Sequence, residues 1–381
     1  METKKNKRKG FNWRRAISAS GNLFQFHKNY NNRQFKSQST IGVKSEKESE
    51  SRRRYQVGLK SRVHHVTDIL HTEPLKSNHD VFMLVICGEE GIGKTTIATV
   101  VYRELLCRFE SGSFIANVKE IGKNTNGIVR LQQKLLSDIC NGREIQIDNV
   151  ENGKSIIDKT LSRRKVFVVL DDVDAFDQLN ALCGSVSWFG KGSRIIITTN
   201  HEGLLNGDWR NEGWLNKNWV TSEYIVRKLD VTESLELLSW YAFKEEYPEE
   251  DFEELLRAAV DLCKGLPLAL EVLGSYLFGR KIAEWESALE ILLNDRGLDI
   301  MNLLKVGFYG CDDMVKYIFL NICDSYIGKD RDNTVKQLEE IGFSAEIGID
   351  VLEQRCLLSM DMENKFMMHW FASNNGKPNI S

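Results

Sequence analysis

The amino-acid sequence predicts an α/β fold in which a parallel sheet is followed by a helical domain and a winged-helix domain. Three observations support this prediction. The apolar run Val81–Cys87 has no polar interruption, which is typical of a strand buried on both faces, and a glycine-rich loop follows it. Strand and helix patterns then alternate as far as residue 229, which predicts parallel strands joined by helices. Beyond residue 230 the helical pattern dominates.

The glycine-rich loop reads Gly88-x-x-x-x-Gly93-Lys94-Thr95, and a helix-compatible run over 97–106 comes after it. Glycines let the backbone curl so that its N–H groups point at phosphate oxygens, and the helix adds the positive end of its dipole. Lys94 would reach the outer phosphates, and the Thr95 hydroxyl would bind Mg²⁺. A glycine-rich turn without a ligand is the weaker alternative. The order of strand, loop and helix therefore predicts a phosphate-loop NTPase sheet that binds a nucleotide.

The other elements are predicted from apolar runs and helical spacing. An amphipathic helix precedes the first strand, with Val63, Val66, Ile69 and Leu70 on one face. Further strands of the sheet are predicted at 113–118, 165–174, 192–200 and 223–227, and the helices between them at 127–140 and 152–162. Later helices are predicted at 252–260, 267–278, 283–293 and 298–322. Residues 334–370 combine two short helices with a hairpin, which is a winged-helix pattern.

Two aspartates end the strand that begins at Lys165. In phosphate-loop proteins an acid at the place of Asp171 holds the Mg²⁺ that bridges the outer phosphates. Asp172 is the candidate to orient or deprotonate an attacking water, and we expect slow hydrolysis because fast hydrolases of this layout usually have the longer Glu. The alternative is that both aspartates only cap the next turn. Thr198 and Thr199 reach the same edge of the sheet, where open α/β sheets bind ligands.

The charge distribution separates a basic arm from an acidic body. Residues 1–60 carry 16 Lys and Arg against 4 Glu, a balance of +12, so the rest of the chain carries −15 within the net charge of −3. Such an arm can serve nuclear import, nucleic-acid binding or organelle targeting, but a solvated, disordered tail is the preferred interpretation. The acidic body predicts no direct binding of nucleic acid.

Other compositional features argue against membrane and export roles. No apolar run approaches the roughly 20 residues that span a bilayer, and the N-terminus lacks the apolar core of a secretory signal. The eight cysteines form no Cys-x-x-Cys pair, and we expect reduced core residues of an intracellular protein. Trp209, Trp214 and Trp219 are five residues apart, a spacing of neither helix nor strand. We expect them to pack their loop onto the body, and an exposed apolar patch is the alternative.

Taken together, the motifs resemble the nucleotide-binding core of plant disease-resistance proteins, the nucleotide-binding leucine-rich-repeat receptors. The resemblance covers about residues 55–370. Its motifs, in chain order, are Val57-Gly58, Gly88–Thr96, Phe109–Phe114, Leu170–Val173, Gly192–Arg194 with Thr198-Thr199, Gly265–Leu268 and Met368-His369. Asp174 and the fragment Trp13–Gly21 are similar to the subclass that carries a Toll/interleukin-1-receptor domain.

The resemblance implies an ADP/ATP switch in plant immune (defence) signalling. ADP would hold the domains closed, and ATP would open them and allow oligomerisation. The implied partners are other resistance proteins or further copies of this chain, and the expected location is cytoplasmic, or nuclear through the basic arm. The implied domains are a basic, mostly disordered arm with a remnant helix at 1–54, a nucleotide-binding domain at 55–229, a helical domain at 230–296, a winged-helix domain at 297–371 and a disordered tail at 372–381.

The resemblance also assigns roles to single residues by motif. Val57 and Pro267 would contact the adenosine, and His369 would reach the β-phosphate from the winged helix. The phosphates would be held by Gly91, Gly93, Lys94, Thr95 and Thr96, and the Mg²⁺ by Thr95 and Asp171, with Asp172 as the catalytic residue. The same motifs contribute Gly58, Gly88, Ile92 and Thr199 to the expected nucleotide site.

Three departures from the family pattern leave a second function open. Asn200 stands where the family has an Arg aimed at the γ-phosphate, and Trp370 stands where it has Asp after Met-His. No leucine-rich repeat follows and only twelve residues precede Trp13, so we expect a chain truncated at both ends. The alternative is a non-catalytic adaptor or decoy that pairs with full-length relatives and holds the nucleotide for structure only. Either function allows at most a slow Mg²⁺-dependent ATPase, and the helical modules disfavour an ordinary motor or kinase.

Overall fold

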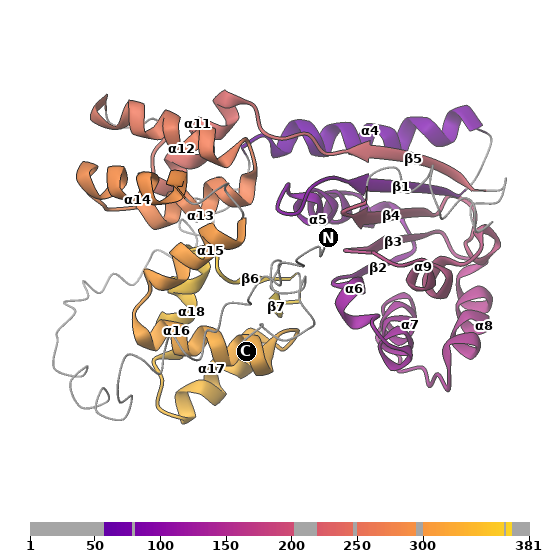
Figure 1. The fold of residues 1–381 in the computed structure, drawn as a ribbon. Helices are drawn as coiled ribbons and strands as arrows, with labels where there is room; N and C mark the ends of the chain where they lie inside the picture. The colour runs from indigo at the N-terminus through magenta and orange to yellow at the C-terminus, as the bar shows by residue number, and fades with distance from the viewer. Residues whose placement is uncertain are drawn as a thin grey trace, which may run out of the picture.

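The computed structural model describes residues 57–77, 81–201, 219–246, 250–294, 300–361 and 363–367 (Figure 1). Several predictions concern residues outside these ranges. They are the basic arm with its remnant helix, Trp209, Trp214, the Met368–Trp370 motif and the C-terminal tail.

Five parallel strands form the sheet, in the order β2-β3-β4-β1-β5. They are β1 (Phe82–Cys87), β2 (Ser111–Ile115), β3 (Val166–Leu170), β4 (Arg194–Thr199) and β5 (Val220–Ile225). Every residue of β1 and β3 is buried, which explains their unbroken apolar runs. β1 lies between β4 and β5, with Cys87 opposite Thr199 and Ile225 at the carboxyl ends. The predicted α/β fold with a parallel sheet is confirmed.

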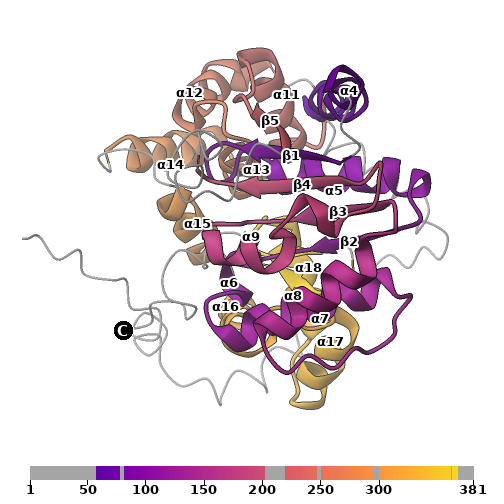
Figure 2. The ribbon, with the colours of Figure 1, turned by 90° about the vertical axis from the view of Figure 1, so that its right-hand side faces the viewer.

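Helices cover both faces of the sheet (Figures 1 and 2). One face packs on α4 (Leu59–Ser77) and α5 (Lys94–Leu105), and the other on α7 (Thr125–Ile139), α8 (Val150–Leu161) and α9 (Phe176–Cys183). The short segments between them are η2 (Leu106–Arg108), α6 (Val118–Ile121) and η3 (Val186–Trp188). Alternate residues of β1 serve the two faces, because successive side chains of a strand point to opposite sides. Phe82 and Leu84 pack with α4 and α5, whereas Met83 and Val85 pack with the other helices.

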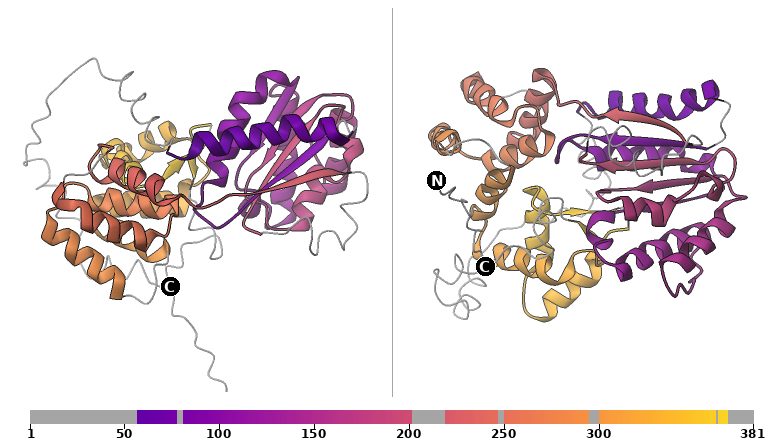
Figure 3. Two further views of the ribbon diagram at one scale, coloured as in Figure 1. Left: turned by 90° about the horizontal axis from the view of Figure 1, so that it is seen from above. Right: turned by 45° about the vertical axis from the view of Figure 1, so that its right-hand side comes forward.

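After β5 the chain forms helices and a hairpin that share one hydrophobic core, which includes residues from Leu229 to Phe366. The helices are α11 (Val231–Ala242), η4 (Glu250–Phe252), α12 (Glu253–Cys263), α13 (Pro267–Leu277), α14 (Ile282–Asn294), α15 (Ile300–Tyr309), α16 (Asp313–Asn321), η5 (Ile322–Tyr326), α17 (Arg331–Glu340) and α18 (Ala345–Gln354). The hairpin strands are β6 (Ser359–Met360) and β7 (Phe366–Met367). These elements lie at the carboxyl ends of the sheet strands (Figures 1 and 3). Because their core is continuous, the domain boundary predicted at 296 stays a prediction.

Some elements differ from their predictions. The helix predicted over 298–322 is broken between α15 and α16, because Gly310 weakens a helix and Asp312 takes the N-cap position of α16. β5 begins at Val220, three residues before the predicted start. The sequence pattern does not predict α9, because its N-cap residue, Ala175, has neither a hydroxyl nor a carboxylate. There the side chain of Gln178 accepts hydrogen bonds from the backbone N–H groups of Asp174 and Ala175 instead.

The cysteines follow their prediction only in part. All eight cysteines are free thiols, and Cys107 is exposed, so the prediction that the cysteines are core residues is wrong for Cys107.

Trp219 is buried and packs edge-on against Phe189, with 6.1 Å between ring centroids. In the part of the chain that the structure describes, no helix is both long enough and apolar enough to cross a membrane.

Two helical glycines give a matched test of the packing. A Cβ at Gly127 in α7 would lie 1.6 Å from the backbone oxygen of Ile121, whereas a Cβ at Gly307 in α15 would meet side-chain carbons, the nearest 3.5 Å away. We expect Gly127→Ala to destabilise the fold by about 2 kcal/mol or more. Gly307→Ala should stabilise it by up to about 1 kcal/mol, because alanine favours a helix. Denaturant titration compares the two variants, and equal effects would contradict the packing described.

Candidate functional site

The loop between β1 and α5 has the backbone shape that its glycines predict. Gly88, Gly91 and Gly93 have φ angles of 148°, 78° and 96°, which side chains rarely allow. Gly93 is the N-cap residue of α5 and offers no side chain to cap the helix. The first N–H groups of α5 and the positive end of its dipole are thus available to an anion. A loop of this shape before a helix is an anion-binding site.

Lys94, the first residue of α5, places a positive charge under this loop. Its Nζ donates hydrogen bonds to the backbone oxygens of Gly88 and Glu89, at 2.9 and 2.8 Å. The side chain is buried, and burial lowers the pKa of its ammonium group. The negative charges of Asp172 and Asp171 raise this pKa, but by less than burial lowers it. The charge therefore sits where phosphate oxygens would approach the loop.

The Asp171 carboxylate joins the ends of three elements. Its Oδ1 accepts hydrogen bonds from the hydroxyl of Thr95 on α5 at 2.8 Å and from that of Thr198 on β4 at 2.6 Å. The Thr198 hydroxyl in turn accepts a hydrogen bond from the backbone N–H of Asp172 at 2.8 Å. Hydroxyl and carboxylate oxygens are the hard ligands that Mg²⁺ prefers, so Thr95 and Asp171 fit the predicted Mg²⁺ site.

Asp172 follows β3 in a strained position. Its φ angle of 60° is in the left-handed region that few residues with side chains adopt. Burial and, less strongly, the neighbouring charge of Asp171 raise the pKa of its carboxyl group to about 6, although Lys119 and Lys94 act to lower it. A carboxyl group with this pKa is mostly ionised at pH 7 and can still accept a proton, as a general base must.

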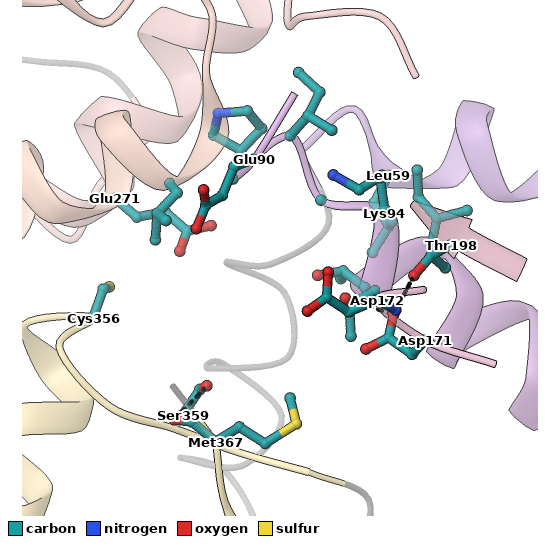
Figure 4. Close-up of a pocket in the computed structure, with 18 of the residues that line it drawn as sticks. Leu59, Glu90, Lys94, Asp171, Asp172, Thr198, Glu271, Cys356, Ser359 and Met367 are labelled. Atoms are coloured by element: carbon teal, nitrogen blue, oxygen red, sulfur yellow. Dashed lines mark hydrogen bonds between the residues drawn. The ribbon is translucent and has the colours of Figure 1, made fainter. Parts of the chain in front are cut away.

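These groups line one cavity of about 290 Å³, shown in Figure 4. The predicted site residues on its wall are Val57, Gly58, Gly91, Ile92, Gly93, Lys94, Thr95, Thr96, Asp171, Asp172 and Pro267. Gly88 does not line it, although its carbonyl holds Lys94. Thr199 is fully buried outside the lining, and its hydroxyl accepts a hydrogen bond from the backbone N–H of His201. His369 lies outside the described residues, and the binding roles of all these residues stay predictions.

Several residues that line the cavity have no role predicted from the sequence. They include Arg62, Glu90, Asn117, Lys119, Glu271, Glu353 and Cys356. Arg62 donates hydrogen bonds to the backbone oxygen of Gly58 at 2.6 Å and to both carboxylate oxygens of Glu233 on α11, at 2.9 and 3.1 Å. Arg62 could have been predicted from the sequence, because it lies one helical turn after Gly58 of the expected nucleotide site. The residues from 271 onward carry no such signal, because only folding brings them to the phosphate loop.

Comparison with known proteins agrees with this geometry. Residues 60–247 match the model of the NB-ARC domain. Residues 60–247 therefore belong to the NB-ARC family, as the motifs predict.

Its relatives are plant disease resistance proteins. The chain is 40% identical over 314 residues to the disease resistance proteins RPV1 and RUN1 of Vitis rotundifolia, matches that cover 82% of this chain and 21% and 22% of those proteins. It is 35% identical over 304 residues to the TMV resistance protein N of Nicotiana glutinosa, covering 78% of this chain and 25% of that protein. The chain thus spans a quarter or less of the length of these relatives.

Solved structures are more distant. The Walker-type ATPase PABY2304 of Pyrococcus abyssi aligns with 80% of this chain and 92% of its own at 15% identity, with a TM-score of 0.40.

The raised pKa of Asp172 predicts a stability effect with a defined sign. An Asp has an ordinary pKa of 3.8, and a folded pKa of about 6 means that the fold disfavours the ionised form. Ionised Asp172 therefore lowers the free energy of unfolding, and this loss grows as the pH rises from about 4 to 6. Asp172→Asn removes this cost and tolerates the left-handed φ, so we expect a gain of about 1 to 3 kcal/mol at pH 7 that shrinks at pH 5.

Denaturant titrations at pH 5 and pH 7 measure this effect. The control is Asp261→Asn, which changes an exposed aspartate in α12 and should give no such gain. A gain for Asp172→Asn that is equal at both pH values would contradict the assigned cause.

Proposed function

We propose that this chain is an ADP- and ATP-binding molecular switch of plant defence signalling that hydrolyses ATP slowly at most. The observation that carries the proposal is the composition of the cavity wall. The phosphate loop, the helix α13 with Pro267 and the segment Cys356–Ser359 before and within β6 all contribute to it. A nucleotide held in this cavity would touch the sheet, the following helices and the hairpin at once.

The residues of the sheet side would bind the phosphates. Backbone N–H groups of the loop and of α5 would face the phosphate oxygens, with Lys94 as the buried cation. Thr95 and Asp171 would hold Mg²⁺, which neutralises charge on the outer phosphates when it is bound. Asp172 would position a water or take its proton, but its side chain is one carbon shorter than the Glu of fast hydrolases. These roles support nucleotide retention over rapid turnover.

A switch also needs contacts between its parts that form or break when a ligand binds. A ligand shifts an equilibrium between two shapes only if it binds them with different affinity. Here the backbone N–H of Leu268 at the start of α13 donates to the Gly91 oxygen of the phosphate loop at 3.2 Å. A second contact between the sheet part and the later elements is the ion pair of Lys134 on α7 with Glu363 in the turn of the hairpin. A nucleotide that displaced the loop or the hairpin would alter these contacts between the sheet and the later elements.

The second candidate is the adaptor or decoy, in which the nucleotide serves structure only. Asn200 favours it, because this exposed residue lines the cavity at the end of β4 with a neutral amide. A neutral side chain makes no charge-assisted hydrogen bond to a γ-phosphate, so it offers less discrimination between ATP and ADP.

The switch and the adaptor differ in whether the bound nucleotide changes the shape of the protein. For the parent chain we expect a larger radius of gyration with ATP than with ADP, measured by small-angle X-ray scattering. Lys94→Ala should abolish the difference, whereas the exposed Lys159→Ala in α8, the same chemical change away from the cavity, should retain it. An identical radius with both nucleotides in the parent chain would contradict the switch and favour the adaptor.

Asn200→Arg tests the nucleotide preference directly. The added guanidinium group would supply a charge-assisted bond, about twice as strong as a neutral one, to a γ-phosphate. We expect the ratio of ATP to ADP affinity to rise about tenfold, as measured by titration calorimetry. Equal ratios in the variant and the parent would sink the role given to position 200.

A further inference from the structure

Glu271 is an acidic residue in the wall of the cavity that none of the predicted roles uses. It lies on α13, one helical turn after Pro267 and therefore on the same side of the helix. The hydrogen bond from the Leu268 N–H to the Gly91 oxygen fixes the start of this helix against the phosphate loop. In Figure 4, Glu271 lies across the cavity from Lys94 and the two aspartates.

Among the described residues, the hydrogen-bond partners of Glu271 are uncharged side chains. Burial raises the pKa of its carboxyl group to about 7, against the lowering effect of hydrogen bonds from Tyr241 and Cys356. Glu353, another acid in the cavity wall, is differently placed, because it pairs with Arg331 at 3.3 Å. A carboxyl group enclosed in a protein without a cation is costly unless donors satisfy its oxygens.

The surroundings of Glu271 offer few donors of their own. The later elements line the cavity mainly with apolar side chains, which are Leu229, Leu237, Pro267, Leu268, Leu357, Leu358 and Met367. Most donors of the site belong to the sheet side, among them the backbone N–H groups of the phosphate loop and the side chains of Lys94, Thr95 and Lys119. The cavity is therefore divided into a donor-rich end and an apolar end that contains this carboxyl group.

We propose that Glu271 accepts hydrogen bonds from the ribose hydroxyls of the bound nucleotide and so makes the site selective for a ribonucleotide. This inference rests on the proposed function, since it takes the phosphates to lie at the donor-rich end. The sugar and base then extend away from Lys94 towards α13. Two neighbouring hydroxyls match the two oxygens of one carboxyl group, and acidic residues bind ribose hydroxyls in the same way in dinucleotide sites.

The test compares ADP with 2′-deoxy-ADP and 3′-deoxy-ADP by titration calorimetry on the full chain. We expect the parent to bind ADP at least about tenfold more tightly than either deoxy analogue. In Glu271→Gln this preference should fall to about threefold, because the amide oxygen is a weaker, neutral acceptor. In Glu271→Ala it should vanish. Glu236→Gln, which neutralises a carboxylate on α11 outside the cavity, should keep the preference of the parent.

Several outcomes would overturn the inference. Tight ADP binding without discrimination between the sugars in the parent would refute the role of Glu271 and leave the proposed function intact. Failure of the parent to bind ADP or ATP at all would refute both. A Glu271→Gln variant that keeps the sugar preference but no longer separates ADP from inosine diphosphate would assign the residue to the base instead. Thermal unfolding without nucleotide checks each fold, and the Gln variant decides the test if the Ala variant does not fold.

Discussion

The Asp171 carboxylate is the group on which the geometry of the cavity depends. It is buried, and its Oδ1 accepts hydrogen bonds from Thr95 and Thr198, which are at the start of α5 and near the end of β4. Bonds to an ionised acceptor are stronger than neutral ones, and an unsatisfied carboxylate at this depth would be costly. The strand order β3-β4-β1 permits the arrangement, because it sets the carboxyl ends of these strands side by side.

The elements after β5 cover this edge of the sheet with a surface that is mainly apolar. The helices after β5 and the hairpin share one core and line the cavity mainly with apolar side chains. They contact the sheet part through polar links, among them the pair of Arg62 with Glu233 at 2.9 Å. A cavity with a donor-rich end and an apolar end suits a ligand that is anionic at one end and apolar at the other, as a nucleotide is.

Sequence reasoning succeeds here where the chemistry is local. The strand, the loop and Lys94 are contiguous, so their pattern predicts their geometry. It also predicts the edge at which Asp171 meets the loop, but not which of two adjacent threonines faces the cavity. Successive side chains of a strand alternate, and a one-residue difference in register puts Thr198 at Asp171 and buries Thr199 elsewhere. Glu271 could not be predicted, because its role depends on packing between segments far apart in the chain.

One nucleotide shared by the sheet, the later helices and the hairpin is the central feature of the proposed switch. Its most direct test is the nucleotide carried by the purified protein, released by denaturation, identified by chromatography and counted against the protein concentration. The proposed switch predicts about one ADP per chain, because a cavity of this kind retains its ligand through many contacts. A protein that carries no nucleotide and takes up neither added ADP nor added ATP would contradict it, and the fold would then serve interaction alone.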